Sequence, residues 1–344
     1  MEVAATTEVF ELEDSADVGA VRRRFHSLAS SAGLDDARAG DAALIATELA
    51  SNVLKHARRG GALLGVAARG TGDARQYGVT IAAWDRGPGM NLEACLRDGM
   101  STAGTRGAGL GAVRRLATRF DAFTFHGKGS VLVATVLPAG PATRATPRFA
   151  VGATCVPYPG LTVCGDAWDH HVDGDRATVL VCDGLGHGDG AADAAAVVLA
   201  AFRAAPDAPL PAIFDRAHRA ARATRGAAAT VARIDLATRE VTVAGVGNVA
   251  VWVAGAAPKQ LVTQHGTLGQ AAPTTIREER QPFAPGAALV LCSDGIKSRW
   301  SFDDHPGLAA RDPATIASVL WRDFARGRDD ASVVVVREVA GRPA

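Results

Sequence analysis

The spacing of apolar and polar positions divides the chain into two successive runs of helices and strands. Apolar residues that recur every three or four positions predict helices, whereas alternating or short continuous apolar runs predict strands. In the first run the expected elements are a strand within 1–15, helices over 17–32 and 41–58, strands over 62–69 and 77–85, a helix over 112–120, and strands over 120–130 and 131–138. This order predicts a mixed α/β unit.

The second run contains more strands than helices. Its expected elements are successive strands between 149 and 183, helices over 190–205 and 208–225, antiparallel strands between 229 and 255, a strand before residue 294, a helix over 313–326 and a closing strand over 331–336. Runs of strands combined with a few helices predict an α+β unit. The chain as a whole is therefore expected to be α/β (α+β) with two domains.

A short segment of different composition separates the two runs. Residues 138–148 carry three prolines with threonine and arginine and show no apolar periodicity, which is typical of an extended, semi-rigid linker. A chain of 344 residues is also long for a single core. We therefore expect one domain over 1–138, a linker over 139–147 and a second domain over 148–338.

Composition and charge narrow the choice of partner and compartment. Apolar residues make up 48% of the chain and charged residues 21%, with a net charge of +1, so neither nucleic acid nor a membrane is expected as a partner. No window approaches the roughly 18 apolar residues that span a bilayer. The N-terminus lacks the apolar core of a signal peptide, and the five cysteines form no CxxC pair. These features favour a cytoplasmic protein with buried, reduced thiols.

Polar side chains and glycines gather near element ends in the first half. Glu48 and Asn52 lie one helical turn apart, where they form either a functional pair or a solvated polar stripe. The strand over 77–85 ends at Asp85, within an Asp-x-Gly-x-Gly turn. The glycine-rich segment 104–111 opens a helix, and free N–H groups at a helix start suit phosphate oxygens. This segment is neither a P-loop nor a Rossmann fingerprint.

Taken together, ATELASNVLKHA, DRGPGM and DGMST…GAGLG resemble the GHKL-type (HATPase) fold, and within it the RsbT-type serine/threonine kinases of bacterial sigma-factor switches. The likeness covers about residues 5–137. It implies an ATP site in which Asn52 holds Mg²⁺, Glu48 is the general base toward a substrate hydroxyl, and Asp85 accepts from the adenine amino group. Glycines would shape the adenine pocket and close over the phosphates: Gly87, Gly89, Gly107, Gly109 and Gly111.

Four acids flank apolar strands in the second half, and three of them stand beside glycine: Asp166, Asp183, Asp294 and Asp329. Asp166 is expected to end one strand and Asp183 the next. An acid at a strand end is either a metal ligand or a solvated turn residue. If the four converge, their mutual repulsion raises their pKa values unless cations neutralise them. No cluster of cysteine and histidine is present, so two Mg²⁺ or Mn²⁺ ions that share a water fit better than zinc.

Segments GDAWD, VCDGLGHG, LCSDGI and GRDDASVVVV resemble the metal-dependent PPM serine/threonine phosphatases of the SpoIIE/RsbX type, over about residues 148–337. The resemblance implies a β-sandwich flanked by helices. It also implies two metal ions bridged by Asp183, one also bound by Asp166 and the Gly184 carbonyl, the other by Asp294 and Asp329.

Two features depart from the phosphatase pattern. The aromatic residue that usually follows the first Gly-Asp directly is replaced by Ala167-Trp168. No arginine stands where larger relatives clamp the phosphate. The combined hypothesis is a bifunctional bacterial signalling enzyme, an ATP-dependent protein kinase fused to a phosphoserine/phosphothreonine phosphatase. By resemblance, its substrates would be STAS-domain proteins of the anti-sigma antagonist or stressosome scaffold type. Two alternatives stay open for the first half: a nucleotide-dependent docking module without turnover, and an ATP-sensing domain that regulates the phosphatase.

Overall fold

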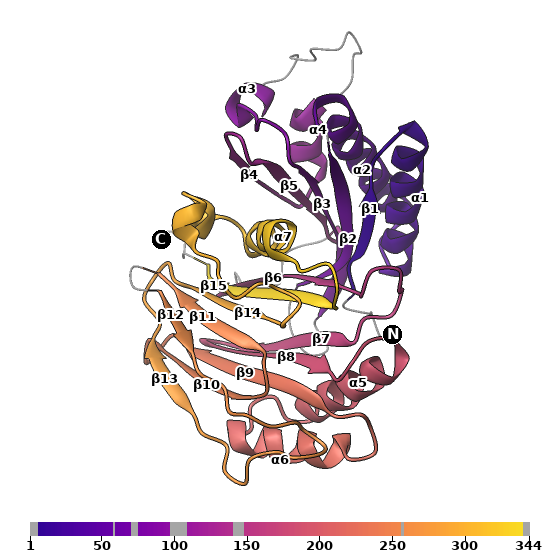
Figure 1. The fold of residues 1–344 in the computed structure, drawn as a ribbon. Helices are drawn as coiled ribbons and strands as arrows, with labels where there is room; N and C mark the ends of the chain where they lie inside the picture. Colours follow the sequence, from indigo (N-terminus) through magenta and orange to yellow (C-terminus); the bar gives the residue numbers. More distant parts are fainter. Residues whose placement is uncertain are drawn as a thin grey trace. The chain divides into compact units, whose positions relative to one another are not determined.

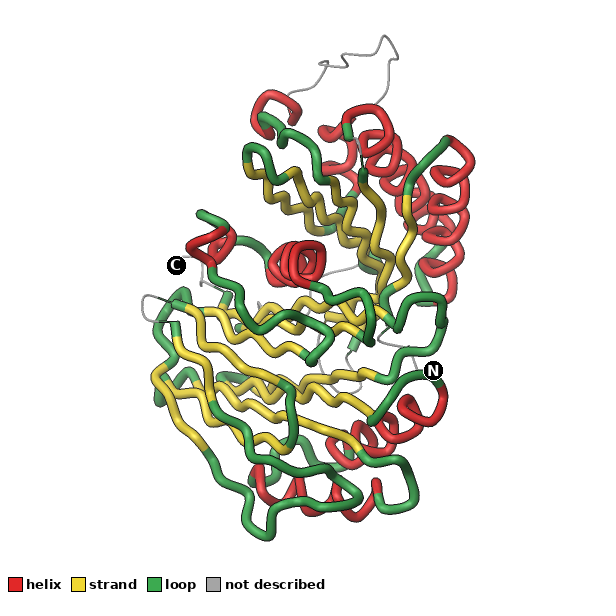
Figure 2. Tube along the Cα trace, in the orientation of Figure 1, coloured by secondary structure: helices red, strands yellow, loops and turns green. Residues whose placement is uncertain are grey.

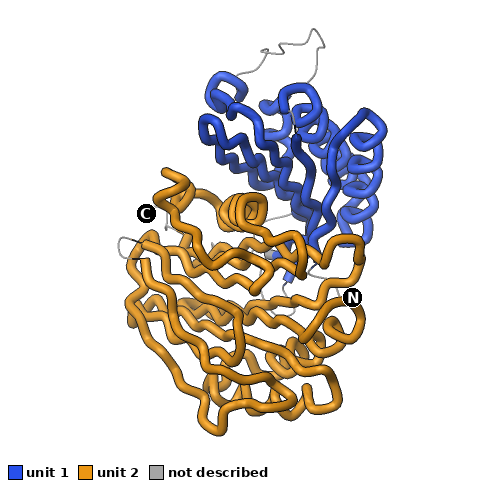
Figure 3. Tube along the Cα trace, in the orientation of Figure 1, with its two compact units in different colours: residues 1–144 blue, residues 145–344 orange. Residues whose placement is uncertain are grey.

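The computed structural model describes residues 6–57, 59–69, 75–96, 109–139, 148–255 and 258–339. The chain divides into two compact units, residues 1–144 and 145–344 (Figure 3). Each unit has its own hydrophobic core. The linker expected over 139–147 lies, except for Ala139, outside the described residues.

The first unit is an antiparallel sheet with helices packed on one face (Figure 1). Its strands pair in the order β1-β2-β3-β5-β4. Its described elements are β1 (Glu8–Glu11), α1 (Ser15–Ser31), α2 (Asp36–His56), β2 (Gly60–Arg69), β3 (Gln76–Asp85), α3 (Leu92–Leu96), α4 (Gly109–Leu116), β4 (Arg119–Phe125) and β5 (Gly129–Val136).

Helix α2 is central to the core of this unit. Asp35 caps its N-terminus by accepting a hydrogen bond from the Arg38 amide (2.8 Å). Ile45, Leu49 and Val53 recur every four residues, and all three are buried against the sheet. The apolar spacing therefore fixes which face of α2 is left to carry polar side chains.

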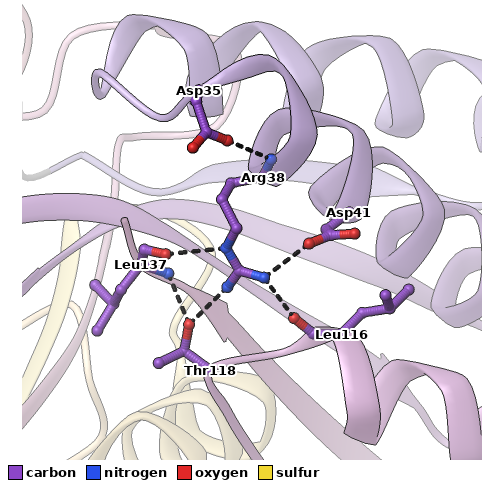
Figure 4. A network of polar contacts seen from close by, with 6 residues as sticks. All are labelled: Asp35, Arg38, Asp41, Leu116, Thr118 and Leu137. Atoms are coloured by element: carbon purple, nitrogen blue, oxygen red, sulfur yellow. Dashed lines mark hydrogen bonds and ion pairs between the residues drawn. The ribbon is translucent and has the colours of Figure 1, made fainter. Parts of the chain in front are cut away.

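Arg38, in the first turn of α2, ties this helix to two other parts of the unit (Figure 4). Its guanidinium donates to the carbonyl oxygens of Leu116 (2.9 Å) and Leu137 (3.1 Å) and to the Thr118 hydroxyl (2.7 Å). It also forms an ion pair with Asp41 (2.7 Å). Leu116 ends α4 and Leu137 follows β5, so one side chain fixes the end of α4 relative to α2 and the sheet.

The strands described in the second unit form two sheets (Figures 1 and 2). One has the order β13-β10-β9-β8-β7 and the other β12-β11-β14-β15-β6, with antiparallel neighbours throughout. The described strands are β6 (Phe149–Val156), β7 (Asp166–Asp173), β8 (Arg176–Gly184), β9 (Ala227–Asp235), β10 (Glu240–Val246), β11 (Ala250–Ala254), β12 (Lys259–Leu261), β13 (Glu279–Pro282), β14 (Ala288–Cys292) and β15 (Ala331–Glu338). The α-helices are α5 (Asp189–Arg203), α6 (Leu210–Ala221) and α7 (Pro313–Phe324).

The inner faces of the two sheets pack on each other. Val181 of β8 meets Leu291 of β14 and Val334 of β15 in one buried cluster. Alternation along β8 sends Leu180 and Cys182 to the other face, where α5 and α6 cover them. Helix α7 packs on β6 and β15 of the second sheet. This is a β-sandwich flanked by helices, and the predicted α/β (α+β), two-domain fold class is confirmed.

One sheet of the sandwich has polar strands at both edges. Edge strand β13 has the sequence Glu-Arg-Gln-Pro, and edge strand β7 carries Asp169, His170 and His171 among its residues. Charges and proline on an edge strand oppose pairing with another chain. None of the described helices of either unit combines the length and apolarity needed to cross a membrane.

Three expectations from the sequence are wrong. The helix expected over 112–120 ends at Leu116, because Arg119 and Phe120 pair with β5 as the start of β4. Asp166 begins β7 instead of ending a strand. Cys95 is exposed, whereas the other four cysteines are buried as expected.

We expect residues 1–144 and 145–344, expressed separately, each to fold. The reason is that none of these three hydrophobic core clusters is shared between the units. One cluster lies wholly in the first unit, and the other two lie wholly in the second. Circular dichroism during heating, with the whole chain as the reference, should show a cooperative transition for each piece. A piece that is soluble but unfolded would show that its core depends on the other unit.

Candidate functional site

The first candidate site lies where α2 meets the end of β3. Glu48 and Asn52 lie one turn apart on α2, and both are partly buried. Asp85, the last residue of β3, is buried, and its carboxylate accepts hydrogen bonds from the amides of Gly87 (2.6 Å) and Ser130 (3.2 Å). Two backbone donors therefore fix the orientation of this carboxylate.

Glycine allows α2 to approach this strand end closely. Gly60 pairs with Asp85 across β2 and β3, and a Cβ at position 60 would lie 2.5 Å from Val53 Cγ1 of α2. A Cβ at Gly87 would lie 3.6 Å from the His56 carbonyl oxygen at the end of α2. The structure thus sets the turn after β3 against the half of α2 that carries the predicted base and magnesium ligand.

The remaining predicted glycines divide into three cases. Gly89 has φ +83°, and a Cβ there would lie 3.0 Å from a backbone carbonyl oxygen, so this turn requires glycine. Gly109 (φ +52°) and Gly111 lie at the start of α4, whose Leu110 is buried in the same core as α2. Gly107 lies outside the described residues.

The second candidate site lies at one end of the sandwich in the second unit. Asp166 begins β7 and pairs directly with Asp183 near the end of β8, because the two strands are antiparallel. Asp294 follows β14 and Asp329 precedes β15, which are also antiparallel neighbours. The structure therefore brings all four predicted acids to one end of the sandwich.

Burial and mutual crowding raise the pKa values of three of these acids, Asp166, Asp183 and Asp294. Burial, followed by the charges of Asp166, Asp294 and Asp329, raises the pKa of Asp183 to about 9. Burial also raises the pKa of Asp166 to about 7, in spite of a hydrogen bond from the Ser293 hydroxyl. The pKa of Asp294 is raised by burial and by Asp329. The mutual repulsion expected from the sequence is therefore present.

The donor atoms at this end fit a hard divalent cation. Carboxylate oxygens are the ligands that Mg²⁺ and Mn²⁺ prefer, and the buried Asp166 Oδ2 has no hydrogen-bond partner. Within the described ranges, however, no three His, Cys, Asp or Glu side chains stand close enough together to enclose an ion. A cation would have to draw the carboxylates together while it neutralises their repulsion.

Gly184 lets α5 begin directly against the end of β8. A Cβ at this position would lie 2.0 Å from the Ala191 carbonyl oxygen, so no other residue fits without a backbone shift. The Gly184 amide donates to the Gly165 carbonyl (3.0 Å). This bond holds the end of β8 to the segment that leads into β7.

Two polar residues beside the acids were not singled out from the sequence. Asp330 is buried, its carboxylate accepts from the Tyr158 amide (2.8 Å), and burial raises its pKa. Asn248 Nδ2 donates to Asp294 (2.7 Å). The doubled acid in GRDDAS was a signal for Asp330, whereas Asn248 lies between two strands with no local sign of its partner.

Arg225 places a positive charge beside the loop that follows β8. The carbonyl oxygen of its neighbour Gly226 accepts from the Leu185 amide (3.0 Å). A Cβ at Gly186 would lie 3.4 Å from Arg225 Nη1, and one at Gly190 would lie 2.7 Å from Nε, so the guanidinium lies against this loop and the first turn of α5. The side chain is exposed, which leaves it open to an incoming anion.

Comparisons with known proteins match the two units of the chain to two different families. Residues 12–136 match the model of the histidine kinase-like ATPase domain, and residues 173–338 match that of stage II sporulation protein E. The serine/threonine-protein kinase RsbT of Bacillus subtilis (strain 168) is 30% identical over 119 residues, which are 34% of this chain and 86% of RsbT.

Two further relatives match part of the chain. The phosphoserine phosphatase RsbX of Bacillus subtilis (strain 168) is 30% identical over 90 residues, 26% of this chain and 45% of RsbX. A solved structure described under "The bacterial stressosome: a modular system that has been adapted to control secondary messenger signaling" is 28% identical with a TM-score of 0.51. The match covers 55% of this chain and 99% of that one.

These likenesses define a two-domain protein with an HATPase domain followed by a SpoIIE-type phosphatase domain. The chain belongs to the RsbT family of serine/threonine kinases by its first unit, fused to a SpoIIE/RsbX-type phosphatase domain. Both resemblances seen in the sequence are confirmed. The matched part of the chain spans less than half the length of RsbX.

We expect Asp183→Asn to weaken Mn²⁺ binding by more than about tenfold. Removing a residue that only hydrogen-bonds to a metal ligand already lowers metal affinity by about tenfold or more, and Asp183 is predicted to be a ligand itself. Isothermal titration calorimetry on the whole chain measures this. Asp189→Asn is the matched control, since Asp189 is an exposed acid in the first turn of α5. Equal affinity in the two variants would exclude Asp183 as a ligand.

Proposed function

We propose that this protein both adds and removes phosphate on a regulatory partner. Its first unit would transfer the γ-phosphate of Mg²⁺-bound ATP to a serine or threonine hydroxyl, and its second would hydrolyse phosphoserine or phosphothreonine. The observation that carries the proposal is the cluster of acids at the end of the sandwich, with the pKa of Asp183 raised to about 9. Ionising these acids together is costly unless cations bind there.

The partners would be STAS-domain proteins of the anti-sigma antagonist or stressosome scaffold type, in the cytoplasm. Similarity to RsbT and RsbX, and to a structure described with the bacterial stressosome, supports this choice. The net charge of +1 and the balanced composition give no support to nucleic acid or a membrane as a partner.

Kinase chemistry in the first unit would rest on α2. Asn52 would hold Mg²⁺ on the ATP phosphates, and Asp85 would accept from the adenine amino group beside Gly87 and Gly89. Gly107, Gly109 and Gly111 would close over the phosphates. Glu48, one turn from Asn52, would take the proton from the hydroxyl that attacks the γ-phosphate, a contribution of about 10²–10⁴ in rate.

Phosphatase chemistry would rest on the acids of the second unit. Asp183 would hold both of two Mn²⁺ or Mg²⁺ ions, Asp166 and the Gly184 carbonyl one of them, and Asp294 and Asp329 the other. Bound ions would supply an activated water and neutralise charge on the phosphoryl group.

Arg225 would fill the phosphate-anchoring role that the sequence left unassigned. Its guanidinium lies against Gly186 of the loop after β8 and Gly190 in the first turn of α5, close in the chain to Asp183 and Gly184. A guanidinium offers paired donors that match phosphate oxygens.

A two-stage labelling experiment tests the whole proposal. The chain is incubated with radiolabelled ATP and a STAS-domain protein encoded nearby, and excess Mn²⁺ is then added with unlabelled nucleotide. The proposal requires label to appear on the partner and then to leave as inorganic phosphate. Label that never appears would contradict the kinase step, and label that persists after Mn²⁺ would contradict the phosphatase step.

Glu48→Gln separates a working kinase from a docking module. This change keeps the size and hydrogen bonding of the side chain but removes the base, so ATP affinity should stay within a few-fold while phosphotransfer falls by roughly 10²-fold or more. Asn52→Ala should instead weaken nucleotide binding itself. Calorimetry with an ATP analogue and a transfer assay measure the two quantities. A wild type that binds ATP and the partner but transfers no phosphate would favour the docking module.

Arg225→Ala should raise KM for p-nitrophenyl phosphate by about tenfold or more, because a hydrogen bond to a charged group is worth about 1.5–3 kcal/mol and each 1.4 kcal/mol is tenfold. Arg222→Ala is the matched control, since Arg222 is an exposed arginine at the end of α6. Steady-state kinetics with saturating Mn²⁺ give both constants. The same KM in the two variants would rule out Arg225 as the anchor.

A further inference from the structure

Two buried thiols are in contact where the two sheets of the sandwich approach each other. Cys155 lies near the end of β6 in one sheet, and Cys164 lies two residues before β7 in the other. Their sulfur atoms are 3.6 Å apart, and the two residues are only 1% and 7% exposed. The chain therefore places an unlinked cysteine pair between the sheets, nine residues apart in sequence.

The same pair is in contact with the groups around the acids. Cys155 Sγ donates to the Asp166 carbonyl oxygen (3.6 Å) and accepts from the Ser332 hydroxyl (3.1 Å). Cys164 donates to the carboxylate of Asp330, and a Cβ at Gly165 would lie 2.7 Å from Asp330 Oδ2. Movement of either sulfur therefore acts directly on the segment that positions Asp166.

We propose that Cys155 and Cys164 are an oxidisable pair that closes to a disulfide and thereby lowers the activity of the second unit. With hydrogen peroxide as the oxidant, one sulfur attacks a peroxide oxygen, the O–O bond breaks, and a sulfenic acid and water form. The other sulfur then attacks the sulfenic sulfur and releases a second water. Overall, two thiols lose two protons and two electrons, and the peroxide is reduced to two waters.

Little movement is needed to close the bond. The sulfurs would approach from 3.6 Å to the disulfide length of about 2.05 Å. The segment before Cys164 is exposed at Leu161 and Val163, and it contains Gly160 with φ +86°, so it can shift at the surface without disturbing a strand. A reversible disulfide of this kind is compatible with a reducing compartment, where such bonds are transient.

Closure would change the site in two ways. It would remove the Cys164 S–H that donates to the Asp330 carboxylate, and it would pull the residues that lead into Asp166 toward β6. A misplacement of about 1 Å at a reacting site can cost 10²-fold in rate. The effect on turnover rests on the proposed phosphatase function, whereas formation of the disulfide does not.

Peptide mapping tests the pair itself. The whole chain is treated with hydrogen peroxide and digested without reductant, and the linked Cys155–Cys164 peptide is expected, lighter by two hydrogens than the reduced pair. The contact with Cys155 and burial raise the pKa of the Cys164 thiol, so long incubations are used. The exposed Cys95 reports that the oxidant was active. Oxidised Cys95 without the linked peptide would overturn the proposal.

Assays of phosphatase turnover and of Mn²⁺ binding test whether the disulfide lowers the activity of the second unit. Turnover of p-nitrophenyl phosphate with Mg²⁺ is expected to fall at least about tenfold on oxidation and to return with dithiothreitol. Cys155→Ala and Cys164→Ala should resist this loss, and Cys95→Ala should not; if an alanine variant misfolds, the serine variant replaces it. Full turnover in the linked protein would overturn the regulatory role. If the reduced protein has no turnover, the proposed function fails, and Mn²⁺ affinity with and without the disulfide still decides this inference.

Discussion

The crowding of partly buried carboxylates is the constraint on which the second unit depends. Antiparallel pairing sets Asp166 beside Asp183, and the pairing of β14 with β15 brings Asp294 and Asp329 to the same end. A raised pKa means that the folded chain holds the Asp183 proton more tightly than the unfolded chain. The free energy of unfolding therefore falls as pH rises from near 3.8 to about 9. Cations that bind the folded state oppose this loss, so they stabilise the unit most at neutral and alkaline pH.

The first unit depends on close packing more than on charge. Helix α2 reaches the end of β3 because Gly60 leaves room for Val53, and this approach sets the polar face of the helix beside the Asp85 turn. Arg38 then fixes the far end of α4, at Leu116, against α2. The elements that carry the predicted ATP ligands are thus held together by the core and by one arginine, before any nucleotide binds.

Much of the fold could be predicted from the sequence, because strand ends and glycine turns leave local signals. The acids at strand ends each leave a local signal, but the apolar run before Asp166 indicates a strand that ends there, whereas Asp166 begins β7. The contacts of Arg225 and of the pair Cys155 and Cys164 join segments through tertiary folding, so no local pattern indicates them. The sequence does not indicate the end of α4, because pairing with β5 overrides helical preference there.

The polar edge strands of the sandwich have a consequence for how a partner is recognised. An unprotected edge would invite a partner peptide to bind as an added strand, held mainly by backbone hydrogen bonds that read little of its sequence. The proline and charges of β13 and the polar residues of β7 discourage that mode. At this sheet, recognition would then rest on side chains in the loops, and loops can change between relatives without altering the sandwich. A single scaffold could in this way be redirected to a new partner by a few loop substitutions.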